Sequence, residues 1–309
     1  MKFFQKEGGE YMKTIFTKDL NDNDVIATCF MIMKKVARDN GNLIAYIGDK
    51  TGDVKAQILD ENDTLQVGDV IWIRGYKDTI LLVEEFKKEE DFDIKNFLPT
   101  VAIPIEKIMK EIKQISDEEF KTPETKALND YFFKNEEFLE RFKKGIGGLR
   151  QHHNYIGGLA EHTLNVMYMA KVLAYRYDCR FKEIAILAAK LHDIGKIEEY
   201  FVDGPFSVTM RGDMEGHIVI GMGMIEEAFR IGESIYSEEF KNRLKGCIVQ
   251  HHGKPEYGSP KTINTEEAFV VHYADYIDAT FNKVQLVKSA TEPGTWSEYD
   301  RRIGTRLFL

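Results

Sequence analysis

A histidine and an aspartate stand side by side in the segment Leu191-His192-Asp193-Ile194-Gly195-Lys196, at the end of an apolar helical run. Both side chains bind divalent cations, but two ligands alone do not complete a metal site. All eight histidines of the chain lie between His152 and His272. We therefore expect one metal site built in this part of the chain, with further ligands among His162, His217, His251 and Asp275.

Helical periodicity places these further candidates on the inner faces of helices. His162 falls on the side of Val166, Met169 and Leu173, His217 on that of Gly221 and Met224, and Asp275 on that of Val271 and Ala279. The helix that ends near Leu191 is expected to present His192, Asp193 and Lys196 from its last turn. After residues 240–248, the apolar side points toward His251, whereas His252 lies about 100° away. The periodicity thus favours His251 over His252.

Four inward histidines and two inward aspartates would be costly to bury in an apolar bundle without a cation or a complete hydrogen-bond network. A histidine and carboxylate set without thiolates is typical of a catalytic Mn, Fe, Ni or Zn centre. The three cysteines, Cys29, Cys179 and Cys247, are far apart and indicate neither a zinc ribbon nor a disulfide framework. The ligand set therefore favours a catalytic centre over a structural zinc site.

Composition limits what else the protein can be. The 309 residues suggest two domains, and 42 basic against 51 acidic residues give a net charge of −9. This balance argues against broad coating of a polyanion, so a nucleic acid would have to be bound locally. The N-terminus lacks the apolar core of a signal peptide, and no apolar run is long enough for a membrane span. We expect a cytoplasmic protein without membrane association; a homo-oligomer remains open.

The first part of the chain has the alternating pattern of short β-strands. In residues 25–33, the side chains predicted to share a buried face are Val25, Ala27, Cys29, Met31 and Met33. Similar runs cover residues 43–47, 54–58, 70–76 and 79–86, and the turns at 39–42 and 51–53 favour two hairpins. Five short strands with little helix predict a small closed barrel.

Two segments of this region, Ala45-Tyr46-Ile47-Gly48-Asp49-Lys50-Thr51-Gly52-Asp53-Val54 and Val67-Gly68-Asp69-Val70-Ile71, resemble an OB-fold, which we assign to residues 14–90. The resemblance implies that single-stranded nucleic acid stacks on aromatic rings and meets nearby cations. The stacking candidates are Phe30, Tyr46, Trp72 and Tyr76, and the phosphate-binding candidates are Lys34, Lys35, Lys55 and Arg74. Each aromatic could instead belong to the core, and each lysine could simply be solvated.

Helical patterns replace strands after a mixed charge run and two prolines, Pro99 and Pro104. We take residues 91–104 as a linker, 105–290 as a helical domain and 291–309 as a C-terminal tail. The tail carries Arg301, Arg302 and Arg306. These arginines could line a path for nucleic acid, or the tail could pack on its own domain or on a neighbouring subunit.

The ordered series His162, His192-Asp193, His217, His251 and Asp275 resembles the HD-domain metal-dependent phosphohydrolase superfamily over residues 146–278. The resemblance implies one ion held by His162, His192, Asp193 and Asp275, and a second held by His217, His251 and a bridging Asp193. Lys196 matches a family lysine that approaches the phosphate, so Asp193 and Lys196 are the catalytic candidates. We expect two divalent ions per site, Mn²⁺ first, with Fe, Ni, Zn, Co or Mg as alternatives.

An OB-fold before an HD domain that contains Gly157-Gly158-Leu159-Ala160-Glu161-His162-Thr163 resembles the YhaM-type 3'→5' exoribonucleases over nearly the whole chain. The predicted fold is an N-terminal all-β OB-fold barrel followed by an all-α HD-domain helical bundle. The resemblance implies a metal-dependent 3'→5' exonuclease acting on single-stranded RNA or DNA through a metal-bound hydroxide. Two alternatives stay open: a nucleotide or cyclic-nucleotide phosphodiesterase, and a non-catalytic single-strand-binding protein whose helical bundle is structural.

Overall fold

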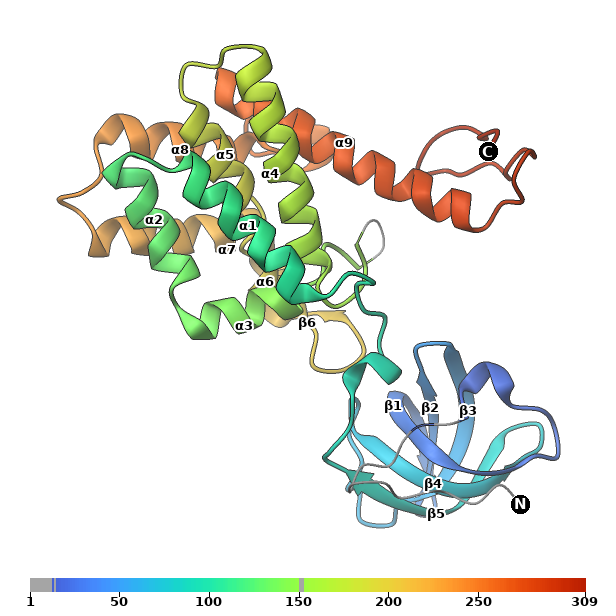
Figure 1. The fold of residues 1–309 in the computed structure, drawn as a ribbon. Helices are drawn as coiled ribbons and strands as arrows, with labels where there is room; N and C mark the ends of the chain where they lie inside the picture. Colours follow the sequence, from blue (N-terminus) through green and yellow to red (C-terminus); the bar gives the residue numbers. More distant parts are fainter. Residues whose placement is uncertain (1–12, 14, 150–152) are drawn as a thin grey trace. The chain divides into compact units, whose positions relative to one another are not determined.

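The computed structural model describes residue 13 and residues 15–149 and 153–309, which form two compact units (Figure 1). The first unit contains the five strands of the barrel, extends to Thr100 and includes the loop Val202–Phe206. The second unit is helical and comprises Val101–Phe201 and Ser207–Leu309. This arrangement confirms the predicted order of a β-barrel followed by a helical domain. None of the described helices is both long and apolar enough to cross a lipid bilayer.

The first unit is a closed five-stranded barrel, as predicted. Its strands are β1 (Val25–Asp39), β2 (Asn42–Asp49), β3 (Gly52–Leu59), β4 (Val70–Lys77) and β5 (Leu81–Glu89). They close in the order β1-β2-β3-β5-β4, and only the β3–β5 pair is parallel among the described pairs. Asn40 and Gly41 join β1 to β2 with positive φ angles of 47° and 78°. Asn-Gly favours such a turn because both residues tolerate left-handed backbone conformations.

The burial of β1 agrees with the prediction only in part: Cys29 and Met31 of the predicted face are buried. Ile26, Phe30 and Ile32 fill the barrel core, whereas Val25 is 82% exposed. Both alternating sets of β1 are largely apolar, so alternation could not decide which set points inward; the larger Ile and Phe side chains occupy the closed interior. Phe30 is fully buried there and is unavailable for stacking, which corrects its assignment as a nucleic-acid contact. A register shift between Ile32 and Lys34 then changes which residues of β1 face outward.

The second unit packs its helices around one large apolar core. The helices are α1 (Ile105–Glu119), α2 (Pro123–Phe133), α3 (Glu136–Lys144), α4 (Gly158–Arg176), α5 (Lys182–Leu191), α6 (Lys196–Glu199), α7 (Met210–Ile231), α8 (Glu238–Gln250) and α9 (Glu266–Ser289). Helix α4 packs against α1, α5 and α9. A short hairpin, β6 (Tyr200–Phe201) with β7 (Ser207–Val208), departs from the all-α expectation.

The C-terminal tail folds back on itself after α9. Trp296 pairs with Phe308, and Asp300 pairs with Thr305, through isolated β-bridges. Arg302 forms an ion pair with Asp300, and Arg306 lies over the Trp296 ring. Two of the three tail arginines are thus engaged within the tail itself.

The burial of Phe30 predicts that Phe30→Ala destabilises the barrel by about 3 to 5 kcal/mol, because a large core side chain is lost and a cavity is left. Tyr46→Ala should cost much less, since Tyr46 is only half-buried on the outer surface. Urea unfolding followed by Trp72 fluorescence, in a Trp296→Phe background, measures both free energies. Equal losses from the two variants would contradict the assignment of Phe30 to the core.

Candidate metal centre and strand-binding surface

The sequence predicted the His192-Asp193 pair in the last turn of a helix. In the structure, the pair lies in a turn between two helices. Helix α5 ends at Leu191, and Lys196 is the first residue of α6. Gly195 allows this turn to approach α7 closely, because a Cβ at that position would lie 2.0 Å from the His217 backbone oxygen. Any larger residue at Gly195 would push the turn away from α7.

A kink in α7 positions His217. Gly216 has φ 71° and ψ 158° inside the helix, a combination that is adopted almost only by glycine. His217 is the first residue after this kink. The periodicity of the sequence placed His217 inward but could not reveal the break in the helix.

The predicted ligands of the first ion converge in the structure. The Nε2 atom of His162 lies 3.2 Å from His192 Nε2, 3.4 Å from Asp193 Oδ2 and 3.3 Å from Asp275 Oδ1. Atoms bound to one cation at about 2.0 to 2.2 Å are separated by about 3 to 3.5 Å in tetrahedral or octahedral geometry. The ligand atoms of His192, Asp193 and Asp275 therefore lie at coordination-sphere distances from His162, and those of His162, His192 and Asp193 form one compact group.

The two oxygen atoms of Asp193 face different histidines. Oδ2 lies 3.4 Å from His162 Nε2 and 3.3 Å from His192 Nε2. Oδ1 lies 3.4 Å from His217 Nε2 and 3.7 Å from His251 Nε2. This orientation is the one that a carboxylate needs to bridge two neighbouring cations.

The second nitrogen of His162, His192 and His251 has its own acceptor, and that of His217 has a carboxylate nearby. The Nδ1 atoms of His192 and His251 lie 2.8 Å from Ala189 O and 2.6 Å from Ile248 O. Those of His162 and His217 lie 2.6 Å from Asp278 Oδ2 and 3.3 Å from Glu199 Oε2. An acceptor at Nδ1 holds the proton there and leaves the Nε2 lone pair for a metal. The rings of His162, His192 and His251 are therefore oriented with Nε2 toward the centre.

Several polar atoms at the centre have no hydrogen-bond partner in the described part of the chain: Asp193 Oδ1, His217 Nε2 and His251 Nε2. They are buried, so leaving them unsatisfied costs free energy. A divalent cation would satisfy all three, and oxygen and imidazole donors suit such an ion. The residues present thus fit the group that the sequence implied.

Electrostatics keep Asp193 and His251 in their metal-binding forms. Burial alone would raise the pKa of Asp193, but the charges of Lys196 and His192 hold it well below its usual range. Burial, followed by the neighbouring His252 and His192, lowers the pKa of His251. The carboxylate is therefore ionised, and the imidazole of His251 neutral, at physiological pH.

His252 is a potential ligand that the periodicity disfavoured. Its ligand atom lies with those of His217 and His251 in a group within 4.8 Å, and its Nδ1 is buried without a hydrogen-bond partner among the described residues. Burial and the nearby His217 lower its pKa to about 4. Helix α8 ends at Gln250, and His251 keeps helical backbone angles (φ −63°, ψ −30°), so the two adjacent imidazoles reach this group from different directions. His272 differs, because its Nδ1 faces the backbone oxygen of His251 at 2.7 Å.

A buried network behind His162 was not predicted. Asp278 Oδ2 lies 2.6 Å from His162 Nδ1 and 2.8 Å from His153 Nε2, while its Oδ1 accepts a 2.7 Å bond from Asn165. His153 has a φ of 52°, a left-handed conformation unusual for histidine. The sequence feature that could have revealed this network is the spacing of Asp278, which lies one helical turn after Asp275 on α9.

Lys196 reaches the centre from the start of α6. Its Nζ lies 2.6 Å from Asp193 Oδ2 and donates a 2.6 Å hydrogen bond to the Gly147 oxygen. The residue is only 6% exposed. Lys196 is thus a buried cation beside the carboxylate that faces both histidine pairs.

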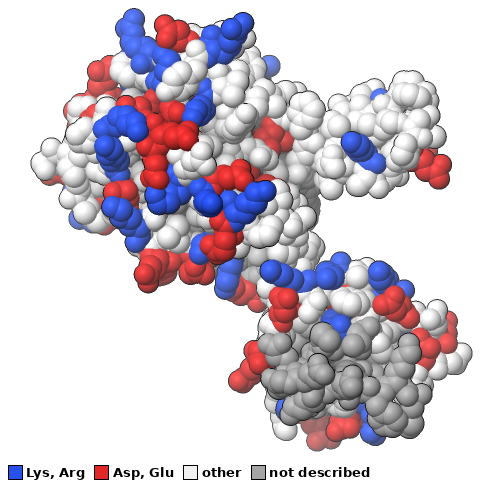
Figure 2. Space-filling model, in the orientation of Figure 1, with Lys and Arg blue, Asp and Glu red and all other residues white. Residues whose placement is uncertain are grey.

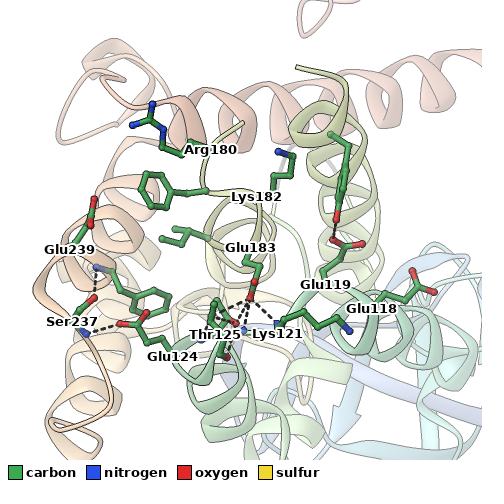
Figure 3. Close-up of a pocket in the computed structure, with 15 residues that line it drawn as sticks. Glu118, Glu119, Lys121, Glu124, Thr125, Arg180, Lys182, Glu183, Ser237 and Glu239 are labelled. Carbon is green, nitrogen blue, oxygen red and sulfur yellow. Dashed lines mark hydrogen bonds between the residues drawn. The ribbon is translucent and has the colours of Figure 1, made fainter. Parts of the chain in front are cut away.

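A separate cavity of about 530 Å³ contains none of these residues (Figure 3). Glu183 lies within it and accepts hydrogen bonds from the backbone of Lys121 and Thr122 and from the hydroxyl of Thr125. These bonds satisfy the carboxylate at the start of α2. The Glu183 carboxylate in this cavity therefore caps α2. The described residues that line the cavity offer no catalytic arrangement.

The remaining nucleic-acid candidates fall into two groups on the barrel. Tyr46 is paired with Lys34 on one neighbouring strand and with Lys55 on the other, so the half-buried ring lies between two exposed lysines. Trp72, Arg74 and Tyr76 follow one another on the outward side of β4, where Arg74 lies 3.9 Å from both Glu84 and Glu85. Lys35 is engaged elsewhere, with Asp63 and the Leu65 oxygen.

Comparison with known proteins shows which domain family the helical unit belongs to. The HD domain family model matches residues 159–280, so the helical unit contains an HD domain, which implies a divalent metal ion. The 3'-5' exoribonuclease YhaM of Bacillus subtilis is 30% identical over 282 residues, 86% of this chain and 87% of that protein. YhaM of Bacillus pumilus is 29% identical over 314 residues, 96% of this chain and 97% of that protein. The chain belongs to the YhaM family of HD-superfamily phosphodiesterases, as the sequence had indicated.

The Asp278 network predicts that Asp278→Asn lowers Mn²⁺ affinity about 10- to 100-fold, because the support of a ligating histidine is weakened. Titration of the metal-free protein with Mn²⁺ against a competing chelator measures this change. Asn165→Ser leaves both histidine contacts of Asp278 intact and should have a smaller effect. Unchanged affinity in a folded Asp278→Asn protein would show that His162 does not need this carboxylate.

Proposed function

We propose that this protein is a metal-dependent 3'→5' exoribonuclease that hydrolyses single-stranded RNA. The observation that carries the proposal is the orientation of the histidine Nε2 atoms around the two oxygens of Asp193. Family membership supports the reaction, since the relatives are named as 3'-5' exoribonucleases. Direction and preference for RNA rest on those relatives.

The proposed centre holds two divalent ions, Mn²⁺ first among the candidates. His162, His192, Asp193 and Asp275 would hold one ion, and Asp193, His217 and His251 the other, with His252 as an additional donor. When bound, such ions lower the pKa of water and neutralise charge on phosphoryl oxygens. The chain contributes ligands already oriented by Asp278, Glu199 and two backbone carbonyls, so little reorganisation accompanies the reaction.

Lys196 has two tasks in this proposal. Its ammonium group balances the buried charge of Asp193, to which it is ion-paired at 2.6 Å. The same positive charge stabilises the negative charge that develops on the phosphoryl group during attack. Lys196 cannot itself ligate a cation while it is protonated.

The barrel would hold the strand upstream of the reacting end. The Tyr46 ring can stack on a base while Lys34 and Lys55 on either side meet phosphates. Figure 2 shows basic and acidic residues intermingled over the visible face of the helical unit. A few contacts at Tyr46 and its two flanking lysines, rather than a broad basic surface, are consistent with the net charge of −9.

Incubation with 5'-labelled single-stranded RNA and DNA tests the proposal, with Mn²⁺ or a chelator and with a duplex control. We expect a ladder that shortens from the 3' end of RNA, requires metal and disappears in Asp193→Ala. Cleavage from the 5' end, or turnover of small nucleotides only, would contradict the proposal.

The position of Lys196 predicts that Lys196→Ala lowers turnover by about two orders of magnitude, comparable to the loss of one oxyanion donor. The metal content should remain that of the unmodified protein, because no ligand is removed. Single-turnover rates and elemental analysis measure the two quantities separately. Loss of metal from the variant would show that Lys196 acts mainly by supporting Asp193.

The surface of the barrel predicts that Tyr46→Ala weakens the binding of long single strands about 5- to 100-fold, through loss of one base–aromatic stack. Hydrolysis of a small phosphodiester should be unchanged, since Tyr46 belongs to the other unit. Fluorescence anisotropy with chelator present gives the affinity. Tyr76→Ala provides a comparison for the aromatics of β4, and an unchanged affinity in both variants would exclude the barrel as the strand-binding surface.

A further inference from the structure

A run of exposed rings follows α9 beside the metal centre. Phe269, Tyr273 and Tyr276 are 46%, 52% and 58% exposed. Their spacing of four and three residues places them on one side of the helix. Val271 and Ala274 of the same helix are fully buried in the core. The three rings therefore contribute little to the core of the helical unit, although each presents a large apolar face to solvent.

His272 connects these rings to the centre. Its ring lies 5.2 Å from that of Tyr273 and 6.2 Å from that of Tyr276, and the Phe269 and Tyr273 rings are 6.3 Å apart. The His272 Nδ1 atom faces the His251 oxygen at 2.7 Å. Gly253, with φ +84°, lets the imidazole lie against the backbone, because a Cβ there would lie 2.4 Å from the ring. The rings are thus anchored to the segment that carries His251.

The side of α9 next to the rings carries Asp275 and borders the accessible part of the centre. The side chains of Asp275 and His217 are 16% and 14% exposed, whereas those of His162 and Asp193 are 0% and 3% exposed. A substrate phosphate must therefore approach from the side of Asp275 and His217. At 100° per residue on α9, His272 lies about 60° from Asp275 and about 40° from Tyr276, so His272 links the rings to the side of Asp275.

We propose that Phe269, His272, Tyr273 and Tyr276 form a stacking subsite for the nucleobases at the 3' end of the strand. This inference rests on the exonuclease function proposed above. Exposed aromatic faces bind any base without reading its hydrogen-bond pattern, which suits an enzyme that shortens a strand of arbitrary sequence. A protein partner seated on these rings would instead cover the accessible side of Asp275, which favours a nucleobase as the occupant.

The subsite is tested with two 5'-labelled RNAs that differ only in whether their last two 3' nucleotides carry bases. For Tyr276→Ala we expect kcat/KM to fall about 5- to 100-fold on the complete strand, the factor for one lost stack, with little change on the abasic strand. Tyr276→Phe keeps the ring and should behave as the unmodified protein. Tyr177→Ala, an exposed tyrosine just beyond the end of α4, is the matched control and should preserve both rates.

An equal fall on both RNAs would overturn the subsite, because the ring would then not contact a base. If Tyr276→Ala and the unmodified protein have the same kcat/KM on both RNAs, and the variant dissociates from an oligomer, the surface is assigned to contacts between copies of the chain. If the unmodified protein shortens neither RNA, the exonuclease proposal itself fails, and that outcome is separate from the response to Tyr276.

A second measurement does not depend on turnover. RNA ending in 4-thiouridine is crosslinked to the full-length protein in the presence of a chelator, and the modified peptide is identified by mass spectrometry. We expect the crosslink within α9 and its loss in a Tyr273→Ala, Tyr276→Ala double variant. A crosslink confined to the barrel would place the 3' base elsewhere and overturn the proposal.

Discussion

The burial of the Asp193 carboxylate among imidazoles is the interaction on which the helical unit depends. One oxygen of Asp193 has no hydrogen-bond partner among the described residues, and the carboxylate is almost completely removed from water. Such a charge is costly to bury, and the apolar core formed by the surrounding helices must offset that cost. The side chains that converge on it come from α4, α9, the start of the second segment of α7, and the turns that follow α5 and α8. The centre therefore exists only when these elements are packed together.

The sequence predicted the parts of the site that follow from regular helices. His162 and Asp275 lie within α4 and α9, so a period of 3.6 residues located them correctly on inner faces. Periodicity says less where the helices end: His251 and His252 both follow α8, and His192 and Asp193 lie in a turn. It also could not reveal contacts between distant segments. The bond between His153 and Asp278 joins residues far apart in the chain, and no local pattern encodes it.

The barrel shows the same limit in another form. The hairpin turn at Asn40 and Gly41 is encoded locally, and its prediction was correct. Whether each aromatic side chain is buried or exposed is not encoded locally. It depends on which alternate set of β1 points inward and on the register shift after Ile32. Phe30 consequently fills the interior, while Tyr46 on the neighbouring strand remains at the surface. Two aromatic residues thus differ in role: Phe30 contributes to the stability of the barrel, and Tyr46 to the proposed binding surface.

The acceptors behind the histidines have an evolutionary consequence. His192 and His251 are held by the backbone oxygens of Ala189 and Ile248, which remain in place whatever side chains those positions carry. His162 and His217 are held by the carboxylates of Asp278 and Glu199, which one nucleotide change in the gene can remove. Half of the imidazole supports are therefore insensitive to sequence drift, and the other half are exposed to it. Inherited loss or retuning of the metal centre should arise preferentially at Asp278 and Glu199.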